Sequence, residues 1–320
     1  MAEENIRYLS YWLAYSRERG EKGIALDRLT TDSLLPTWFK NLALNIEENR
    51  LRQLPDLDTI PKEKGKPAIV IGAGPSLRKY KHLEILAAKA KNFPGRIIST
   101  DRVFVEALKA GVRVDYVVSI DASEQVAEFY ADPVVAKSEA VMLCDSTVHP
   151  SVIRNFPGKK CVFHAYIDDP DADFKSYSQM MRYMSPQCVL LGGGNAGSTG
   201  WLIAKHLGMS PVALVGMDLG FTMDTDLSKT PYYSSYKAMG YDDKYIAKNL
   251  FRKDHNPDFN NEGVTDYVFD SYVEGMLRYV WLFRDQVETV NCTGGGCLHG
   301  PGIKGMPLER FLAKYGGRSG

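Results

Sequence analysis

The sequence predicts an α/β protein, in which a doubly wound, mainly parallel Rossmann-like sheet follows a small N-terminal helical region. From Pro67 onward, short apolar runs alternate with amphipathic stretches of helical period. The apolar runs are continuous rather than alternating with polar residues, as in strands that are covered on both faces. Several of them end in glycine or aspartate, where the ligands of such sheets bind.

The N-terminal part differs in texture from the rest of the chain. Residues 4–20 and 34–54 place aromatic and aliphatic side chains at helical spacing, and 55–67 interrupts the pattern with three prolines. We therefore divide the chain into a helical region, 1–62, and a Rossmann-like nucleotide-binding or transferase domain, 63–320. The apolar stripe of the helical region is expected to pack on the main domain.

The predicted elements follow from apolar run length and period. Strands are expected at 67–74, 96–101, 115–123, 139–146, 160–166, 187–194, 211–220 and 287–293. Helices are expected at 76–90, 102–111, 197–208 and 265–285. The intervening stretch 221–263 has little periodicity, and a segment that long in a compact domain is usually a lid or a binding loop.

Composition excludes several classes of protein. The 320 residues carry 39 basic and 39 acidic side chains, so no basic face for nucleic acid is expected. No apolar run approaches the length of a membrane span, and the N-terminus lacks the pattern of a signal peptide. Five cysteines without a dense spacing pattern fit a reducing compartment, so a cytoplasmic location is expected. The oligomeric state stays open.

The first glycine-rich turn, in the run IVIGAGPSL, predicts an anion site. A strand that ends in Gly72 and Gly74 and restarts as a helix after Pro75, at Ser76, exposes backbone N–H groups that suit a phosphate. The turn is only a partial dinucleotide fingerprint, because Leu77 stands where the third glycine belongs, and no Walker pattern follows. NAD or S-adenosylmethionine nevertheless remains an alternative ligand to a nucleotide sugar or ATP.

A second turn, GGGNAGST, follows a later strand. Glycines such as Gly193 and Gly194 allow close approach to a ligand, and Asn195 would stand beside them. The competing interpretation is a tight turn with a helix cap from Ser198 or Thr199.

Three aspartates end predicted strands and should converge on one edge of the sheet: Asp101, Asp121 and Asp218. Together they could bind ribose hydroxyls, hold Mg²⁺ with substrate phosphates, or supply a base, and each alone could simply cap a loop. Mg²⁺ is therefore a candidate, whereas no tightly bound organic cofactor is expected.

The third glycine-rich segment, NCTGGGCLHGPGIKG, is expected to be a flexible loop beside the ligand. Its Cys292, Cys297 and His299 have poor spacing for zinc and lack a fourth ligand. His299 and His255, which lies in the aperiodic stretch, are titratable groups that could act as acid or base. The candidate catalytic residues are thus Asp218, His255 and His299.

Four motifs occur in order along residues 64–314: KGKPAIVIGAGPSL, VDYVVSIDAS, LLGGGNAGSTGWLIAKHLGMSPVALVGMDLGFT and VNCTGGGCLHGPGIKGMPLERFL. Together they resemble the central domain of the motility accessory factor (Maf) proteins, which are linked to attaching nonulosonic acids to flagellin. The same superfamily contains the MptE-like 6-hydroxymethylpterin diphosphokinases. The first turn is also similar to the nucleotide-binding turn of some bacterial sialyltransferases.

The resemblance implies nucleotide binding and group transfer. By position, the four named residues of the first turn (Gly72, Gly74, Pro75 and Ser76) would contact the nucleotide phosphate, and Gly193, Gly194 and Asn195 would form the opposite wall. Asp121 and Asp218 would flank the reacting centre. Two departures stand out, since the chain has SIDAS where the pterin enzymes carry Thr-Asp-Leu-Asp-Gly, and it lacks the further helical region of typical Maf proteins.

Three functions follow as hypotheses. The first is a glycosyltransferase that uses a nucleotide-activated sugar, with a CMP-linked nonulosonic acid as the expected donor and a protein or glycan hydroxyl as acceptor. The second is Mg²⁺-dependent transfer of pyrophosphate from ATP to a hydroxymethylpterin. The third is a nucleotide-binding scaffold without catalysis.

Overall fold

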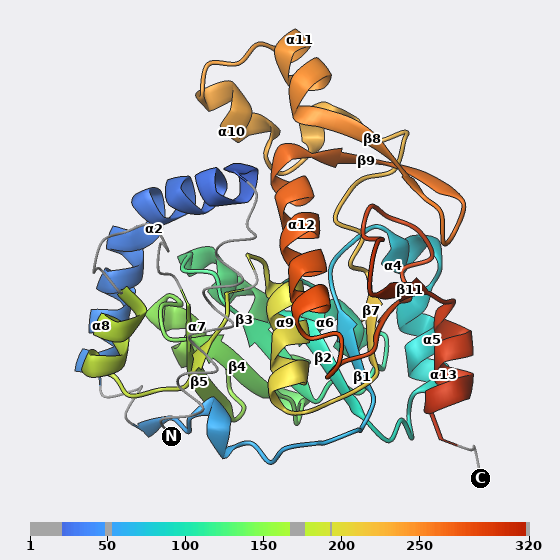
Figure 1. The fold of residues 1–320 in the computed structure, drawn as a ribbon. Helices are drawn as coiled ribbons and strands as arrows, with labels where there is room; N and C mark the ends of the chain where they lie inside the picture. The colour runs from blue at the N-terminus through green and yellow to red at the C-terminus, as the bar shows by residue number, and fades with distance from the viewer. Residues whose placement is uncertain (1–20, 49–52, 167–176, 193, 318–320) are drawn as a thin grey trace.

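The computed structural model describes residues 21–48, 53–166, 177–192 and 194–317. Within these residues, nine parallel strands form one sheet in the order β11-β10-β7-β1-β2-β3-β4-β5-β6, which confirms the predicted fold class (Figure 1). The central strands are β1 (Ala68–Ile71), β2 (Arg96–Thr100), β3 (Tyr116–Ser119), β4 (Val141–Asp145), β5 (Lys160–Ala165) and β7 (Val212–Val215). The edges are formed by β6 (Val189–Leu190) on one side and by β10 (Thr289–Asn291) and β11 (Ile303–Gly305) on the other.

Helices cover both faces of this sheet (Figure 1). The apolar side chains of β1 alternate between two buried clusters, with Ile69 and Ile71 on one face and Ala68 and Val70 on the other. One face is covered by α4 (Ser76–Lys79), α5 (His82–Lys89), α6 (Asp101–Lys109), α7 (Pro150–Asn155) and α13 (Leu308–Tyr315). The other is covered by α9 (Ala196–His206) and α12 (Tyr267–Leu282). Burial on both faces explains why the strands read as continuous apolar runs.

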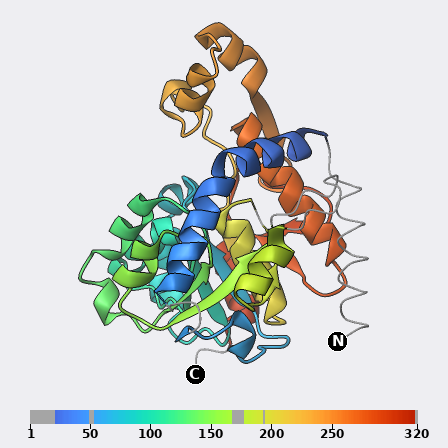
Figure 2. The same cartoon turned by 90° about the vertical axis from the view of Figure 1, so that its left-hand side faces the viewer.

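The N-terminal helix α2 (Glu21–Glu47) runs along the side of the sheet and reaches α12 (Figure 2). Apolar packing on the main domain is observed at Leu42, which is fully buried in the core. Two buried amides add to it: Asn41 Nδ2 donates to the carbonyls of Ala122 and Thr147 at 3.0 and 2.9 Å. One turn later, Asn45 donates to the carbonyls of Ser146 and Val148, the latter at 3.0 Å.

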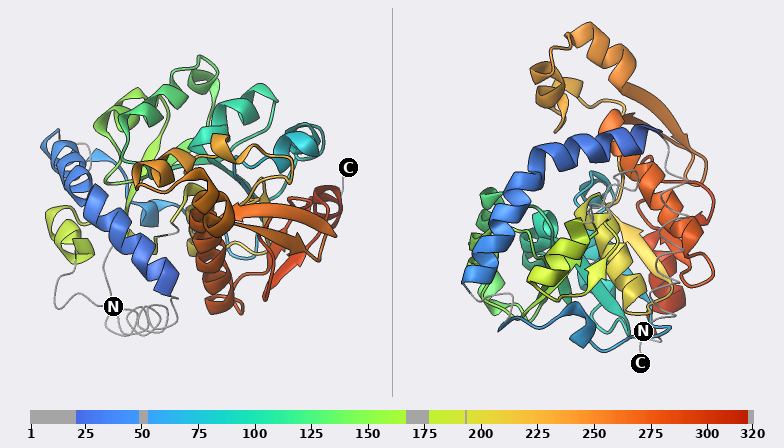
Figure 3. Two further views of the ribbon diagram at one scale, coloured as in Figure 1. Left: turned by 90° about the horizontal axis from the view of Figure 1, so that it is seen from above. Right: turned by 60° about the vertical axis from the view of Figure 1, so that its left-hand side comes forward.

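The stretch 221–263 is more structured than expected. It folds into α10 (Tyr233–Ala238), α11 (Asp243–Tyr245) and an antiparallel hairpin of β8 (Phe251–Asn256) and β9 (Asn261–Asp266). We call residues 221–266 the arm, which rises above the carboxyl ends of the strands (Figures 1 and 3). It has a small core of its own, made by Tyr236, Ile246, Phe251 and Val264.

Other differences from the predicted elements are local. The expected helix 76–90 is two helices, because Lys81 adopts a left-handed φ of 53° that a continuous helix cannot include. The strand expected at 187–194 shrinks to β6, whereas β11 and α13 had no predicted counterpart. Across the part of the chain that the structure describes, none of the helices combines the length and hydrophobicity of a membrane span.

The docking of α2 yields a stability prediction. Replacing Asn45 by Ala leaves the buried carbonyls of Ser146 and Val148 without their donor, which should lower the free energy of unfolding by about 2–3 kcal/mol. The exposed Glu47→Ala change on the same helix should stay within about 0.5 kcal/mol. Urea unfolding of both variants measures the difference, and equal midpoints would show that the amide does not hold α2.

Candidate functional site

The strand order places a topological switch point between β1 and β7. From β1 the chain proceeds outward through β2, β3 and β4, and it later returns to the other side of β1 as β7. In open α/β sheets, ligands bind beyond the carboxyl ends of the strands at such a point. A ligand is therefore expected at the turns that follow β1 and β7.

These two turns pack backbone against backbone. The N–H groups of Gly72 and Gly74 donate to the carbonyls of Val215 and Gly216, each at 2.8 Å. A Cβ at Gly72 would lie 2.6 Å from the carbonyl oxygen of Gly216, and one at Gly74 would overlap Oδ2 of Asp218. Gly216 itself has a φ of +64°. The glycines of the first turn are thus explained by the neighbouring turn, whatever ligand binds beside them.

Asp218 is the residue on which three turns converge. Its Oδ2 accepts hydrogen bonds from Ser76 Oγ at 2.7 Å and from Ser76 N at 3.4 Å. A Cβ at Gly296 would lie 2.7 Å from its Cα, and its carbonyl accepts from Cys297 N at 2.7 Å. The N–H group of Ser76, at the start of α4, therefore donates to the protein's own carboxylate. This is the place where the sequence predicted a phosphate.

Burial sets the electrostatics of this carboxylate. Asp218 is only 5% exposed, and this burial raises its pKa to about 6, although the hydrogen bonds from Ser76 and the charge of Lys79 oppose the rise. At neutral pH the group is mostly ionised, yet it is a far better proton acceptor than an ordinary carboxylate.

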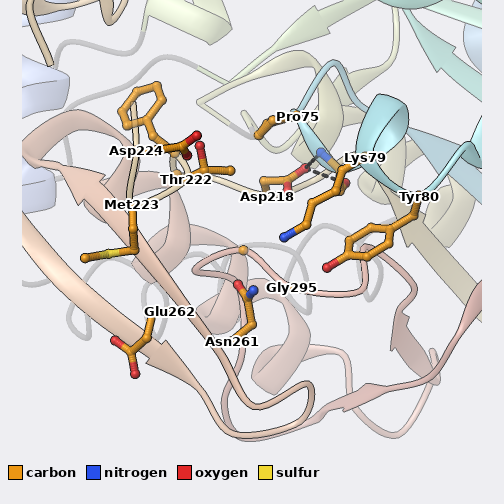
Figure 4. A pocket seen from close by; sticks show the side chains of 14 residues that line it. Pro75, Lys79, Tyr80, Asp218, Thr222, Met223, Asp224, Asn261, Glu262 and Gly295 are labelled. Atoms are coloured by element: carbon orange, nitrogen blue, oxygen red, sulfur yellow. Dashed lines mark hydrogen bonds between the residues drawn. The ribbon is translucent and has the colours of Figure 1, made fainter. Parts of the chain in front are cut away.

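A pocket of about 500 Å³ opens beside Asp218, between the sheet and the arm (Figure 4). This size suits a nucleotide or another small ligand. Its walls come from the first turn and α4, from the chain after β7, from the hairpin and from the third glycine-rich segment. The lining residues are Pro75, Ser76, Lys79, Tyr80, Asp218, Gly220, Phe221, Thr222, Met223, Asp224, Asn261, Glu262, Gly295 and Gly296.

Lys79 is the site residue that the sequence analysis missed. Its side chain points into the pocket between Asp218 and Gly295, beside Tyr80, whose ring centroid lies 5.1 Å from Nζ (Figure 4). Lys79 is one helical turn after Ser76, so both side chains face the same space. That spacing from the glycine turn is the one signal in the sequence that could have indicated it.

The other predicted aspartates lie outside this lining. Asp101 begins α6, where its carboxylate accepts from Arg102 N at 2.7 Å and from Ser119 Oγ at 3.3 Å, and burial raises its pKa to about 6. Asp121 is exposed and accepts from Ser123 N at 2.8 Å, as a loop-capping aspartate does. Only Asp218 of the three reaches the pocket.

The second glycine-rich turn lies against α12. Asn195 caps α9, since its Oδ1 accepts from Ser198 N at 3.0 Å, so the cap is Asn195 and not Ser198 or Thr199. Gly194 has a φ of +72° and faces the ring of Tyr272. Gly193 falls outside the described residues, and Gly194 and Asn195 are not among the residues that line the pocket.

The two candidate histidines pair with carboxylates instead of facing the pocket. His255 Nδ1 lies 2.7 Å from Glu262 Oε1 across the hairpin, on an exposed surface. His299 Nε2 lies 2.9 Å from Asp254 Oδ2. The segment around His299 packs into the core, where Cys297 and Leu298 are buried, and its Gly295 and Gly296 line the pocket.

The buried Asp218 should reduce stability. Its folded-state pKa of about 6 exceeds the ordinary 3.8, so ionisation costs the folded protein free energy that is absent below pH 3.8, grows up to about pH 6 and is constant above. At pH 8, Asp218→Asn should therefore raise the free energy of unfolding by up to about 3 kcal/mol. At pH 4 the gain should fall below about 1 kcal/mol.

Asp101→Asn is the matched control, since Asp101 is also buried and its pKa is also raised to about 6, but it lies outside the pocket lining. Denaturant unfolding at pH 4 and pH 8 should show a comparable gain for both variants. A loss of stability at pH 8 in Asp218→Asn alone would contradict the assigned electrostatics.

Comparison with known proteins agrees with this architecture. The sequence profile of the family described as 6-hydroxymethylpterin diphosphokinase MptE-like matches residues 40–224, more than half of the chain. No curated protein matches. Among solved structures, a Maf glycosyltransferase from Magnetospirillum magneticum AMB-1 shares the fold with a TM-score of 0.57 at 17% identity, over 79% of this chain. This chain spans 35% of the length of that protein. Because this profile matches more than half of its residues, the chain belongs to the MptE-like family.

Proposed function

We propose that the chain is a glycosyltransferase-type enzyme that transfers a sugar from a nucleotide donor to a hydroxyl group of a protein or glycan. A CMP-linked nonulosonic acid is the donor we propose. The observation that carries this proposal is the pocket at the switch point, which combines the ammonium of Lys79 with the raised-pKa carboxylate of Asp218 under the arm. The fold shared with a Maf glycosyltransferase supports it.

In this proposal the donor phosphate lies beside Lys79. An ionised Asp218 disfavours a second anion on the first glycine turn, where its own oxygen accepts from Ser76. The ammonium of Lys79 faces the pocket and would supply a charge-assisted hydrogen bond to phosphate (Figure 4). The ring of Tyr80 lines the same wall and offers a surface for the nucleoside.

Transfer then needs a base and a stabilised leaving group. The acceptor O–H gives its proton to the carboxylate of Asp218, while the acceptor oxygen bonds to the anomeric carbon of the donor sugar. The bond from that carbon to the nucleotide phosphate breaks, and its electron pair leaves on the phosphate oxygen. Lys79 stabilises the charge that develops there.

The arm supplies the acceptor side. Met223 and Asp224 at the start of the arm and Asn261 and Glu262 at the tip of the hairpin line the pocket opposite α4 (Figure 4). An acceptor that enters between the arm and the sheet would reach the wall that contains Asp218. The arm thereby assumes the role of a binding loop that its length indicated in the sequence.

The family description favours a second candidate, the transfer of pyrophosphate from ATP to a hydroxymethylpterin. Mg²⁺ in such enzymes is held by one or two carboxylates and by substrate phosphates. Asp218, Asp224 and Glu262 are the carboxylates that line the pocket. Here Asp218 would hold metal instead of accepting a proton, so the two candidates differ in their dependence on Mg²⁺.

Ligand-dependent thermal unfolding separates the candidates. We expect CMP without metal to stabilise the protein, by about 2.7 kcal/mol at one hundred times its Kd, which is a shift of a few degrees. Lys79→Met should weaken CMP binding at least tenfold, whereas the exposed Lys91→Met should leave it unchanged. Stabilisation only by ATP with Mg²⁺ would favour the diphosphokinase, and no response to any nucleotide would overturn both.

The rate of transfer should follow the protonation of Asp218. With a donor that binds, kcat/KM should rise with pH and level off above about pH 6, since only the ionised carboxylate accepts the proton. Asp218→Asn should lower the rate at least 100-fold while retaining nucleotide binding. Steady-state assays from pH 5 to pH 8 test this, and a variant with unchanged turnover would remove Asp218 from the reaction.

A further inference from the structure

Three side chains of the types that bind metals meet at the amino ends of the strands, on the side of the sheet away from the pocket. They are Asp58 in the turn before β1, Cys188 just before β6, and His206 at the end of α9. Their carboxylate oxygen, sulfur and ring nitrogen lie within 4.8 Å of one another. Among the residues that the structure describes, no other group of three or more His, Cys, Asp or Glu side chains meets this condition.

A fourth residue, Asp56, positions two of the three. One of its carboxylate oxygens accepts from Asp58 N at 2.7 Å, and the other accepts from Cys188 N at 2.6 Å. A single carboxylate therefore ties together two backbone segments that are 130 residues apart (188 minus 58). These bonds fix the backbone positions from which Asp58 and Cys188 extend, and outer hydrogen bonds that support the ligands are a regular feature of metal sites.

A positive charge already lies at the cluster. Lys62 Nζ is 3.0 Å from His206 Nε2 and 3.3 Å from Asp58 Oδ1, while His206 Nε2 is 2.8 Å from the same oxygen. The lysine side chain is 41% exposed, so it can withdraw into solvent on its flexible stem. The cluster thus already binds one cation, the ammonium of Lys62, and this ammonium can move away into solvent.

We propose that Asp58, Cys188 and His206 form a binding site for one divalent metal of the Zn²⁺ class, with water as the fourth ligand. Carboxylate, thiolate and imidazole are the ligands that zinc accepts, and three protein ligands plus water is a known arrangement. Tetrahedral zinc bonds place ligand atoms about 3.3–3.6 Å apart. Atoms of the cluster that are as far as 4.8 Å apart therefore need to close by about 1 Å, whereas His206 Nε2 and Asp58 Oδ1, which are 2.8 Å apart, need to open by about 0.5 Å. Binding releases the thiol proton of Cys188 to solvent.

The site would join three segments that are distant in sequence. It fastens the chain that leads into β1 to the edge strand β6 and to the last turn of α9. Because α9 runs antiparallel to the strands, its C-terminus lies at the amino edge of the sheet, away from Asp218. Metal binding is therefore separable from the proposed transfer reaction, and its expected effect is on stability.

Cobalt is a spectroscopic probe for this proposal. Metal-free protein titrated with Co²⁺ should take up one ion and develop the near-ultraviolet absorption of a thiolate–cobalt bond, which Zn²⁺ then removes. Cys188→Ser should abolish that band and His206→Gln should weaken binding at least tenfold, while His149→Gln at the start of α7 should bind as the wild type does. Circular dichroism verifies that each variant is folded.

Two further variants test the roles of the neighbours. Lys62→Met removes the competing ammonium and should tighten Co²⁺ binding, whereas Asp56→Asn should weaken it about 10–100-fold. A wild-type protein without the thiolate band at stoichiometric Co²⁺, or a Cys188→Ser variant that retains it, would overturn the proposal.

Discussion

The architecture of the site depends on how closely the turn after β1 packs on the turn after β7. Hydrogen bonds of 2.8 Å join the two backbones, and side chains at Gly72 or Gly74 would collide with the partner turn. This contact brings Asp218 over the start of α4, where Ser76 binds its carboxylate. The third glycine-rich segment then closes on the other side of Asp218, with Gly296 against its Cα.

Because of this contact, the first glycine-rich turn differs from a phosphate-binding turn. Such a turn predicts a phosphate on its free N–H groups, but here the carboxylate of Asp218, which follows the neighbouring strand β7, accepts from the N–H group of Ser76. A bound phosphate then needs a different partner, and Lys79 is the cation in the lining of the pocket. The cost is a buried charge with a pKa of about 6, which active sites commonly tolerate at the expense of stability.

Much of the fold could be predicted because the central strands are buried on both faces and read as apolar runs. Strand ends also indicated Asp218, since parallel strands bring their carboxyl ends to one edge. The hairpin could not be predicted in this way, because β8 carries Arg252, Lys253, Asp254 and His255 in succession and shows no apolar alternation. The pairing of His255 and His299 with carboxylates also left no local signal, since His299 meets Asp254 only through long-range folding. In the sequence, Lys79 cannot be told apart from an ordinary solvent-exposed lysine of a helix.

In the proposed function, a nucleotide phosphate lies beside Lys79 under the arm, next to the turn where Ser76 binds Asp218. A crystal structure of the protein with CMP tests it most directly. We predict the phosphate within hydrogen-bond distance of Lys79 Nζ, with Ser76 still bonded to Asp218. A nucleotide bound at the Asn195 turn, or a phosphate seated on the N–H group of Ser76 with Asp218 displaced, would contradict this prediction.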